Sequence, residues 1–297
     1  MMIIRGAMLA AILAAGSAQA QDSWDQVQIR TEPLSGNIHI IYGAGGNIGV
    51  SAGEDGVFIV DDQFAPLTER LKATIAGISD KPIRYVINTH FHYDHTGGNE
   101  KLGSSGTVVV AHDNVRQRLS AGSFIKAFNH TEAPQTGPAL PVVTFSEEMS
   151  LHLNGEDARI IHIPNAHTDG DSIIHFRTSN VIHMGDTFFN GRFPFIDTSN
   201  GGTIDGVIMA ASRALEAADE NTKVIPGHGK LTDKAGLQAY HDMLVEARAR
   251  VKAAKDADEI LEDIIAAGPL NDMEGWVNPK DDGPTKLFIK TIFDTLD

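Results

Sequence analysis

Three histidines and an aspartate lie within six positions of this chain, at His90, His92, Asp94 and His95. They closely follow the apolar run 85–87, so we expect them on the loop at the end of a buried strand. Alternation along an extended chain places His90 and His92 on the same side, and Asp94 and His95 come after the chain turns. Imidazole and carboxylate groups are ligands that suit Zn²⁺. The spacing therefore indicates a metal site rather than a solvated loop.

Three further polar residues stand at the ends of predicted strands, each beside glycine or proline: His167, Asp186 and His228. Taken alone, a histidine in such a place is more often a hydrogen-bonded structural residue. Because the first cluster already points to a metal, we expect these three to join it. The eight remaining histidines match no such motif and are interpreted as structural or surface residues.

The composition limits the class of protein. The 297 residues are 42% hydrophobic and 21% charged, which excludes a disordered chain, a collagen and a disulfide scaffold. The formal net charge of −15 repels phosphate backbones, so we expect a small-molecule substrate and no nucleic-acid partner. The absence of cysteine excludes thiolate ligands and cysteine nucleophiles. The sequence leaves the oligomeric state open.

Residues 1–20 have the pattern of a secretory signal peptide. Arg5 precedes an apolar run over 7–15, and the segment ends in Ala18-Gln19-Ala20, the small-x-small pattern that a signal peptidase cuts after. The apolar run is too short to span a bilayer of about 30 Å. The alternative is a buried N-terminal helix. We expect cleavage near Gln21, export to the periplasm or the medium, and no membrane attachment afterwards.

Hydrophobic periodicity predicts strands first and then strands mixed with helices. Strands are expected over 39–42, 48–51, 57–60, 83–87, 107–111, 142–145, 150–153, 158–163, 172–176, 181–184 and 224–225. Helices are expected over 66–78, from about 113, over 204–218, from 233 to about 267 with one break, and over 285–296, with a proline-rich loop over 129–141. This order packs most simply as two sheets with helices outside, an αββα sandwich. We expect one domain over 21–297, with a C-terminal helical extension over about 233–297.

The motif His-x-His-x-Asp-His, followed by a distant histidine, Gly-Asp and Pro-Gly-His, resembles the metallo-β-lactamase-fold hydrolases. All five sequence blocks occur in the family's order, counting Val60-Asp61-Asp62 as the first, and the resemblance covers roughly residues 30 to 240. It implies an α/β (α+β) protein with the four-layer αββα metallo-β-lactamase sandwich. The metal site would lie at one edge, between the two sheets.

The resemblance also implies a role for each residue. The first metal would be held by His90, His92 and His167, the second by Asp94, His95 and His228, with Asp186 bridging the two. Two Zn²⁺ ions are expected, with iron or manganese as alternatives, and a hydroxide between them would attack a carbonyl carbon. Asp94 would orient that hydroxide. Asp61 would accept a hydrogen bond from a ligand imidazole; the alternative is a turn or cap residue.

Departures from the best-known lactamases narrow the expected function. Asp186 stands at the bridge, as in glyoxalase II and lactonases, and Phe189 occupies the place where the cysteine subclass has a carboxylate-binding lysine. We therefore expect a dinuclear zinc hydrolase of a small amide, lactone or ester, with β-lactams as weak or promiscuous substrates. The alternatives are a glyoxalase II-like thioester hydrolase and a mononuclear iron sulfur dioxygenase of the same fold. A metal-binding protein without turnover is disfavoured because every ligand position is filled.

Two aromatic segments are candidates for the substrate pocket. Phe188, Phe189, Asn190 and Arg192 follow the predicted bridge and suggest an apolar wall with an anion-binding group, with core packing as the alternative. For the segment 124–128, which contains Phe124, Ile125 and Phe128, we expect core packing, and a hydrophobic lid is the alternative.

Overall fold

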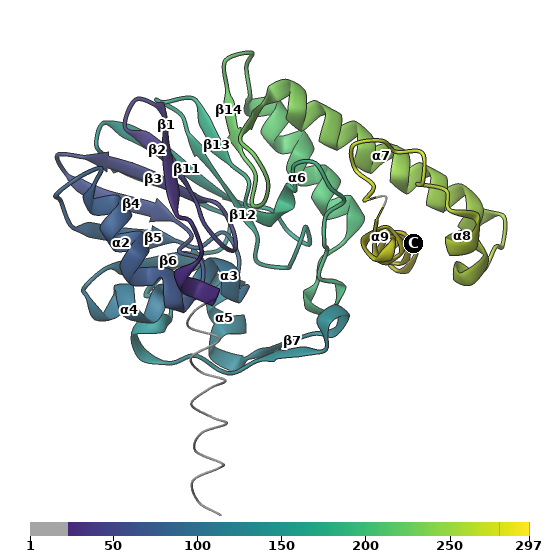
Figure 1. Ribbon diagram of the computed structural model, residues 1–297, viewed down its shortest axis with the longest axis horizontal. Coiled ribbons are helices and arrows are strands. Elements are labelled where there is room, and N and C mark those ends of the chain that lie inside the picture. Colours follow the sequence, from purple (N-terminus) through teal and green to yellow (C-terminus); the bar gives the residue numbers. More distant parts are fainter. Residues whose placement is uncertain (1–22, 279, 297) are drawn as a thin grey trace, which may run out of the picture.

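The protein is described by a computed structural model that covers residues 23–278 and 280–296, so the predicted signal peptide lies outside the described residues. Two β-sheets pack face to face, and helices cover their outer faces (Figure 1). The predicted αββα sandwich is confirmed. Within the described residues, no helix is both long and apolar enough to cross a membrane.

The first sheet contains seven strands in the order β1-β2-β3-β4-β5-β6-β9. These strands are β1 Arg30–Ser35, β2 Ile38–Tyr42, β3 Ile48–Gly53, β4 Gly56–Val60, β5 Ile83–Ile87, β6 Val108–His112 and β9 Val143–Phe145. Strands β1 to β4 pair antiparallel, and β4, β5, β6 and β9 pair parallel. The carboxyl ends of the parallel strands therefore open at one edge of the sheet.

The second sheet contains six strands in the order β10-β11-β12-β13-β14-β15. They are β10 Glu148–Leu153, β11 Glu156–His162, β12 Ser172–Phe176, β13 Val181–His183, β14 Lys223–Ile225 and β15 Thr232–Asp233. All neighbours pair antiparallel except β13 and β14, which are parallel. The loops after β13 and β14 consequently leave the sheet at the same edge.

The inner faces of the sheets form the central core. The rings of Phe58 and Phe176, one from each sheet, stack with centroids 5.8 Å apart. Helix α2 (Thr68–Ala76) covers the first sheet through Leu71 and Ile75. The second sheet is covered by α6 (Ile204–Ala217), α7 (Lys234–Asp256) and α9 (Gly283–Thr295). The other helical segments are η1 Ala65–Leu67, α3 Tyr93–Thr96, α4 Asn99–Ser104, α5 Asp113–Ala121, η2 Lys126–Phe128, η3 Gly137–Ala139, η4 Gly185–Thr187, η5 Thr198–Asn200 and α8 Leu261–Ala267.

Local chemistry explains where the longest helices begin and end. The side chains of Thr203 and Asp233 accept hydrogen bonds from the amides of Gly206 and Gly236, and so cap α6 and α7. Asp258, with φ of 61°, turns the chain between α7 and α8. The predicted single break in the long helical stretch is confirmed.

The segment after α5 differs from the expectation. A hairpin of β7 (Ser123–Ile125) and β8 (His130–Glu132) extends into the region 129–141, where only a loop was expected. Asn129 makes the turn in the left-handed region, at φ 47°, a conformation that asparagine adopts more readily than most residues. The prolines that suggested a loop lie beyond β8, so they do not interrupt its pairing.

Candidate metal centre

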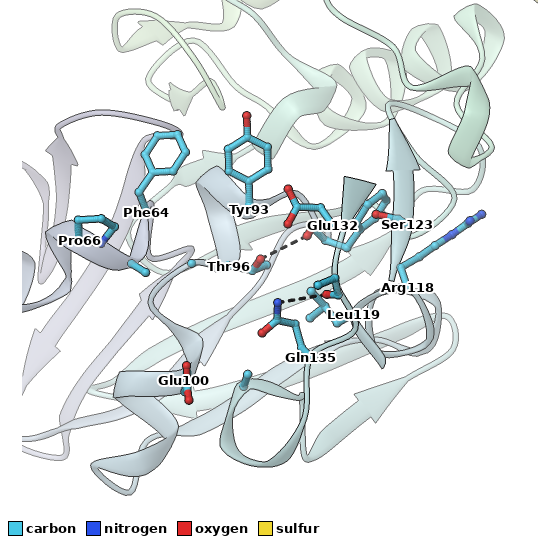
Figure 2. A pocket seen from close by; sticks show the side chains of 15 residues that line it. Phe64, Pro66, Tyr93, Thr96, Glu100, Arg118, Leu119, Ser123, Glu132 and Gln135 are labelled. Atoms are coloured by element: carbon cyan, nitrogen blue, oxygen red, sulfur yellow. Dashed lines mark hydrogen bonds between the residues drawn. The ribbon is translucent and has the colours of Figure 1, made fainter. Parts of the chain in front are cut away.

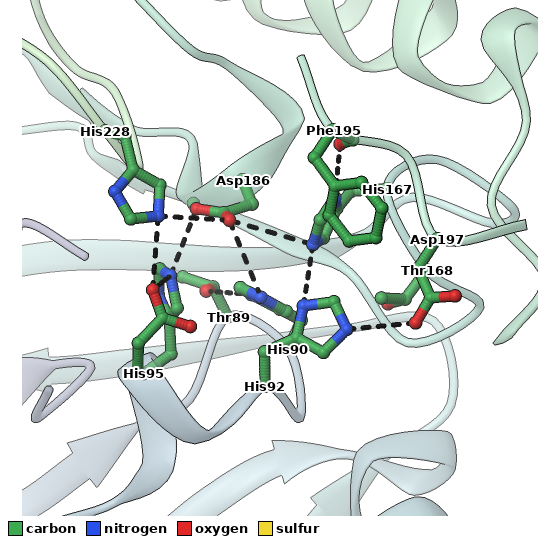
Figure 3. A network of polar contacts seen from close by, with 12 residues as sticks. Thr89, His90, His92, His95, His167, Thr168, Asp186, Phe195, Asp197 and His228 are labelled. Atoms are coloured by element: carbon green, nitrogen blue, oxygen red, sulfur yellow. Dashed lines mark hydrogen bonds and ion pairs between the residues drawn. The ribbon is translucent and has the colours of Figure 1, made fainter. Parts of the chain in front are cut away.

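The seven predicted ligands lie together at the edge where strands of both sheets end (Figure 3). His90 and His92 follow β5, and the short helix α3 then carries Asp94 and His95. The remaining three come from the second sheet, with His167 between β11 and β12, Asp186 after β13 and His228 after β14.

One triad consists of His90, His92 and His167, all of them buried. Nε2 of His167 lies 2.9 Å from Nδ1 of His92. Nε2 of His90 is buried without a hydrogen-bond partner among the described residues. The three rings meet nearly edge to face, with centroids 4.7 to 4.8 Å apart. Three ring nitrogens therefore lie close together, and among the described residues the one from His90 has no hydrogen-bond partner.

A second triad consists of Asp94, His95 and His228. Oδ2 of Asp94 lies 3.6 Å from Nε2 of His95 and 3.3 Å from Nε2 of His228. Asp94 and His228 are each partly exposed, whereas His95 is completely buried. This triad therefore has one side open to solvent.

Asp186 lies between the two triads. Its Oδ1 is 3.1 Å from Nε2 of His95, and its Oδ2 is 3.3 Å from Nε2 of His228. The same Oδ2 lies 3.7 Å from Nε2 of His167 and 3.9 Å from Nε2 of His90. One buried carboxylate thus faces both sets of imidazoles.

The two triads differ in electrostatics. Burial lowers the pKa of His167 to about 4, and burial together with the neighbouring His95 holds the pKa of His90 well below its usual value. Burial alone would lower the pKa of His95 as well, but the carboxylates around it, Asp186 first, raise that pKa well above the usual value. His90 and His167 are therefore neutral imidazoles at pH 7, which is the form that binds a metal. At the second triad a cation would displace protons.

Hydrogen bonds to the ring nitrogens that face away from Asp186 hold two of the imidazoles in place. Nδ1 of His95 lies 2.7 Å from Oδ2 of Asp61, which places Asp61 where the sequence predicts it. The backbone amide and the hydroxyl of Thr89 donate to the same carboxylate, at 2.7 and 2.8 Å. Nδ1 of His167 lies 2.8 Å from the carbonyl of Phe195. Such contacts fix the ring orientation and the tautomer of a metal-binding histidine.

Sequence reasoning missed Asp197. Its Oδ2 lies 3.1 Å from Nε2 of His92, and Ser199 and Asn200 hydrogen-bond the same carboxylate. Asp197 is 1% exposed although it is charged, so its environment is specific. The only trace in the sequence is an isolated acid directly after the apolar run 193–196.

The donor set fits two cations of the zinc type. It offers five imidazoles and two carboxylates, and Zn²⁺ binds both kinds of ligand. Buried Nε2 of His90 has no hydrogen-bond partner among the described residues. Nε2 of His95 and Oδ1 of Asp186 lie 3.1 Å apart as an ion pair but without the geometry of a hydrogen bond, and all three atoms point into the cluster. Unsatisfied buried polar atoms are rare in folded proteins, and a bound ion is one explanation for a group of them.

A cavity of about 840 Å³ opens above the cluster. Its floor includes His92, Asp94, Asp186 and His228. Its walls are largely aromatic: Phe64, Tyr93, Phe128, Phe189, Phe193, Phe195 and Trp276. The volume and the apolar walls are typical of a small-molecule site.

Two of the four predicted pocket residues are not part of its wall. Phe189 and Arg192 line the cavity, whereas Phe188 and Asn190 do not. Phe188 is completely buried and packs on Tyr240, with ring centroids 4.6 Å apart. The amide of Asn190 instead donates to the carbonyl of Lys230, at 2.8 Å.

The segment before the proline-rich loop also differs from the prediction of core packing. Ile125 is buried, but Phe124 and Phe128 are 46% and 58% exposed. Phe128 lies at the tip of the hairpin and contacts Phe195, with ring centroids 4.6 Å apart. The hairpin therefore covers part of the cavity. This agrees with the alternative interpretation of the segment 124–128, a hydrophobic lid.

A second, smaller cavity of about 300 Å³ lies beneath the hairpin (Figure 2). It shares Phe64 and Tyr93 with the larger one, so these two rings form the partition between them. Its lining residues, as far as the structure describes them, include none of the seven cluster residues. The larger cavity is therefore the one that gives access to the cluster.

A family model described as the metallo-beta-lactamase superfamily matches residues 41–228 of this chain. The match covers more than half of the chain and contains every cluster residue. The chain therefore belongs to the metallo-beta-lactamase superfamily, whose members are mainly metal-dependent hydrolases.

Individual relatives are distant. The hydroxyacylglutathione hydrolase of Pelagibacter ubique is 26% identical over 177 residues, which cover 58% of this chain and 63% of that protein. A metallo-beta-lactamase from Pontibacter korlensis superimposes with a TM-score of 0.59 at 17% identity, over 73% of this chain and 99% of that chain. The sec-alkylsulfatase Pisa1 from Pseudomonas sp. gives a TM-score of 0.63 at 15% identity, over 90% of this chain and 50% of that chain. These two structures share the fold.

Proposed function

We propose that this protein is a dinuclear zinc hydrolase that cleaves a small cyclic amide, lactone or ester. The observation that carries the proposal is the position of Asp186, whose two carboxylate oxygens face both triads of potential ligands. A single metal would need only one triad, and a structural zinc site would have no open side. Here the second triad borders the cavity through Asp94 and His228.

In this proposal one cation would be held by His90, His92 and His167 and the other by Asp94, His95 and His228, with Asp186 available to both. When bound, the pair would polarise the scissile carbonyl and lower the pKa of a water molecule toward about 7.

The chain's own residues would position that water. His95 and His228 hold the pKa of the Asp94 carboxyl below its usual range, although burial alone would raise it. Its carboxylate is therefore ionised at neutral pH and can accept a hydrogen bond from the attacking water. A substrate packed against the aromatic walls would displace water from around the reacting group.

A thioester is the second candidate for the scissile bond. Hydroxyacylglutathione hydrolases are among the relatives of this chain, although the chain spans only 63% of the length of the one from Pelagibacter ubique. The cavity supports an apolar substrate of small size, and its one charged residue away from the cluster, among those described, is Arg192. A β-lactam remains a useful probe because it is a strained cyclic amide.

We further propose that the protein is exported, on the basis of residues 1–20, and acts on a small molecule without a nucleic-acid partner. The N-terminal sequence of protein recovered from the producing cells tests the export proposal. A mature start near Gln21 supports it, and intact Met1 contradicts it.

The experiment that tests the proposed function is a turnover panel on zinc-loaded mature protein. A chromogenic β-lactam, an aromatic lactone and an acyl thioester would be compared before and after removal of metal with a chelator. Chelator-sensitive hydrolysis that zinc restores supports the proposal, and the relative rates rank the bonds. Failure to hydrolyse any of the three, together with about one iron per chain and oxygen consumption with thiols, would replace it by the sulfur dioxygenase alternative.

A further inference from the structure

Two histidines of the first triad, His92 and His167, are oriented by one short segment of chain, 195–200 (Figure 3). Nε2 of His92 lies 3.1 Å from Oδ2 of Asp197. Nδ1 of His167 lies 2.8 Å from the carbonyl of Phe195. Carboxylates and carbonyls only accept hydrogen bonds, so each of these ring nitrogens carries the proton. In a neutral imidazole, the lone pair of the other nitrogen then faces the cluster, as a metal ligand requires.

Asn200 connects this segment to its surroundings, and it is only 2% exposed. Its Nδ2 donates to Oδ2 of Asp197 at 2.6 Å and to the backbone carbonyl of Phe124 at 3.1 Å. Its Oδ1 accepts from Nη1 of Arg118 at 2.9 Å. These partners fix the direction of the amide, because a guanidinium only donates and a carboxylate only accepts. Among side chains of this size, asparagine alone offers two donors and an acceptor, so the position is specific for it.

The hairpin of β7 and β8 is connected to the Asp197 carboxylate by two bridging side chains. Asn200 is the first, since its Nδ2 donates both to Asp197 and to the hairpin carbonyl of Phe124. Ser199 is the second. Its Oγ accepts a hydrogen bond from the amide of Lys126, at 3.1 Å, and donates to Oδ1 of Asp197, at 2.5 Å. Each carboxylate oxygen is therefore held by a side chain that also binds the backbone of the hairpin.

A ring contact connects the tip of the hairpin to the second of these histidines. Phe128 packs on Phe195 with centroids 4.6 Å apart, and the ring of Phe195 lies 5.6 Å from that of His167. None of the seven cluster residues lies within 123–132, so the hairpin contributes no ligand itself. A hairpin lifted off the cavity would nevertheless weaken the supports of both His92 and His167.

We propose that Asn200 is a positioning residue for a metal in the first triad, and that it couples this metal to the hairpin over the cavity. With the hairpin down, Asn200 and Ser199 hold Asp197 against His92. With the hairpin lifted, both side chains lose a partner, and the ring of His92 is free to turn. Such coupling is reciprocal, so a cation in the first triad would hold the hairpin down in turn. The inference rests on the metal centre of the proposed function, but not on hydrolysis.

The test compares the same ion in two places. His228→Ala leaves the first triad intact, and His90→Ala leaves the second triad intact. Hydrogen–deuterium exchange of peptides that span 123–132 measures opening of the hairpin, and native mass spectrometry confirms the zinc content. Zinc should slow hairpin exchange about tenfold in full-length mature His228→Ala and less than about twofold in His90→Ala.

Two further variants break the connection without altering a predicted ligand. Ser199 is exposed, so Ser199→Ala should fold normally while it removes one bridge. Asn200→Asp removes both amide donors and places a second carboxylate against Asp197. In the His228→Ala background, we expect zinc affinity to fall about five- to tenfold in Ser199→Ala and about ten- to a hundredfold in Asn200→Asp. Zinc should also slow hairpin exchange less in both variants.

Asn180→Asp is the matched control. Nδ2 of Asn180 also donates to a carboxylate, Oδ1 of Asp219 at 2.8 Å, but in the turn before β13. The same change of amide to carboxylate should there leave both the zinc affinity and the zinc-dependent exchange of the hairpin unchanged.

Equal protection of the hairpin in His228→Ala and His90→Ala, or bound zinc without protection in either, would overturn the inference. So would unchanged zinc affinity in both bridge variants. If Asn200→Asp fails to fold, as judged by its melting temperature, Ser199→Ala decides the question. If His228→Ala takes up no zinc, the protein with all seven cluster residues and its Ser199→Ala variant are compared instead.

The outcomes separate this inference from the proposed function. Zinc-dependent hydrolysis without zinc-dependent protection of the hairpin leaves the proposed function and removes this inference. Protection of the hairpin by zinc in the first triad, without hydrolysis of any substrate in the panel, does the reverse. A protein that binds no zinc at all contradicts both.

Discussion

Nδ1 of His95 and Oδ2 of Asp61 lie 2.7 Å apart, and both side chains are completely buried. Asp61 sits directly after β4 with φ of 64°, a conformation that aspartate and asparagine tolerate better than most residues. The first sheet thus holds Asp61 in a strained backbone conformation, in which its carboxylate orients the imidazole of His95. The contact connects the fold of the first sheet to the candidate metal centre.

Asp61→Asn should weaken the second metal site by about ten- to a hundredfold without unfolding the chain. The amide keeps the shape and the left-handed backbone, but it loses the charge that holds His95 and presents a donor to Thr89. Zinc affinity measured by competition with a chromogenic chelator checks this. Asp205→Asn, which breaks the exposed ion pair with Arg248, is the control and should leave the affinity unchanged. Unaltered zinc affinity in Asp61→Asn would contradict the role.

Asp197→Asn should weaken the first metal site by a similar factor, because His92 loses the carboxylate that orients its ring. The expected loss is selective: one zinc per chain dissociates more readily, and the other does not. Stepwise zinc release monitored by native mass spectrometry distinguishes this from a general loss of stability. Equal release of both ions would argue that Asp197 only supports the loop that contains Ser199 and Asn200.

Gly227→Ala should disrupt the bridging position. A Cβ atom at residue 227 would clash with Oδ1 of Asp186 and lie 2.5 Å from the backbone of Gly185, so the carboxylate must move. We expect turnover to fall at least tenfold. Gly77→Ala is the matched control, since its Cβ meets only the carbonyl of Thr74, at 3.2 Å. A fully active Gly227→Ala enzyme would show that the position of Asp186 is not critical.

Phe128→Ala should raise KM by about three- to tenfold and change the melting temperature by only about 2 °C or less, because the side chain is 58% exposed. Phe124→Ala is the control, since that exposed ring does not line the larger cavity. Steady-state kinetics with the best substrate of the panel provide the measurement. A large loss of stability at unchanged KM would show that Phe128 packs against the protein and does not contribute to substrate binding.

The sequence predicts the fold and the ligand cluster because both produce patterns that are visible within short segments of the chain. Glycine-bounded strands and a metal motif spaced at His90, His92, Asp94 and His95 can be recognised within a few residues. The predicted two-sheet sandwich then accounts for the distant ligands, because strands from both sheets end at the same edge.

The details that the sequence does not predict depend on side-chain direction. Phe188 is extended, with φ of −140° and ψ of 119°, so Phe188 and Phe189 point to opposite sides, one into the core and one into the cavity. The sequence does not indicate which of these two adjacent phenylalanines is buried in the core and which lines the cavity. Asp197 contacts His92 across 105 positions of sequence, and no spacing rule connects them.

If each triad binds a metal, the protein holds two metals per chain. The most direct measurement is the zinc content per chain of the mature protein and of His90→Ala and His228→Ala, determined by elemental mass spectrometry with protein concentration from amino-acid analysis. We expect about two zinc ions per chain in the unaltered protein and about one in each variant. One zinc or none in the unaltered protein, or two in both variants, would contradict it.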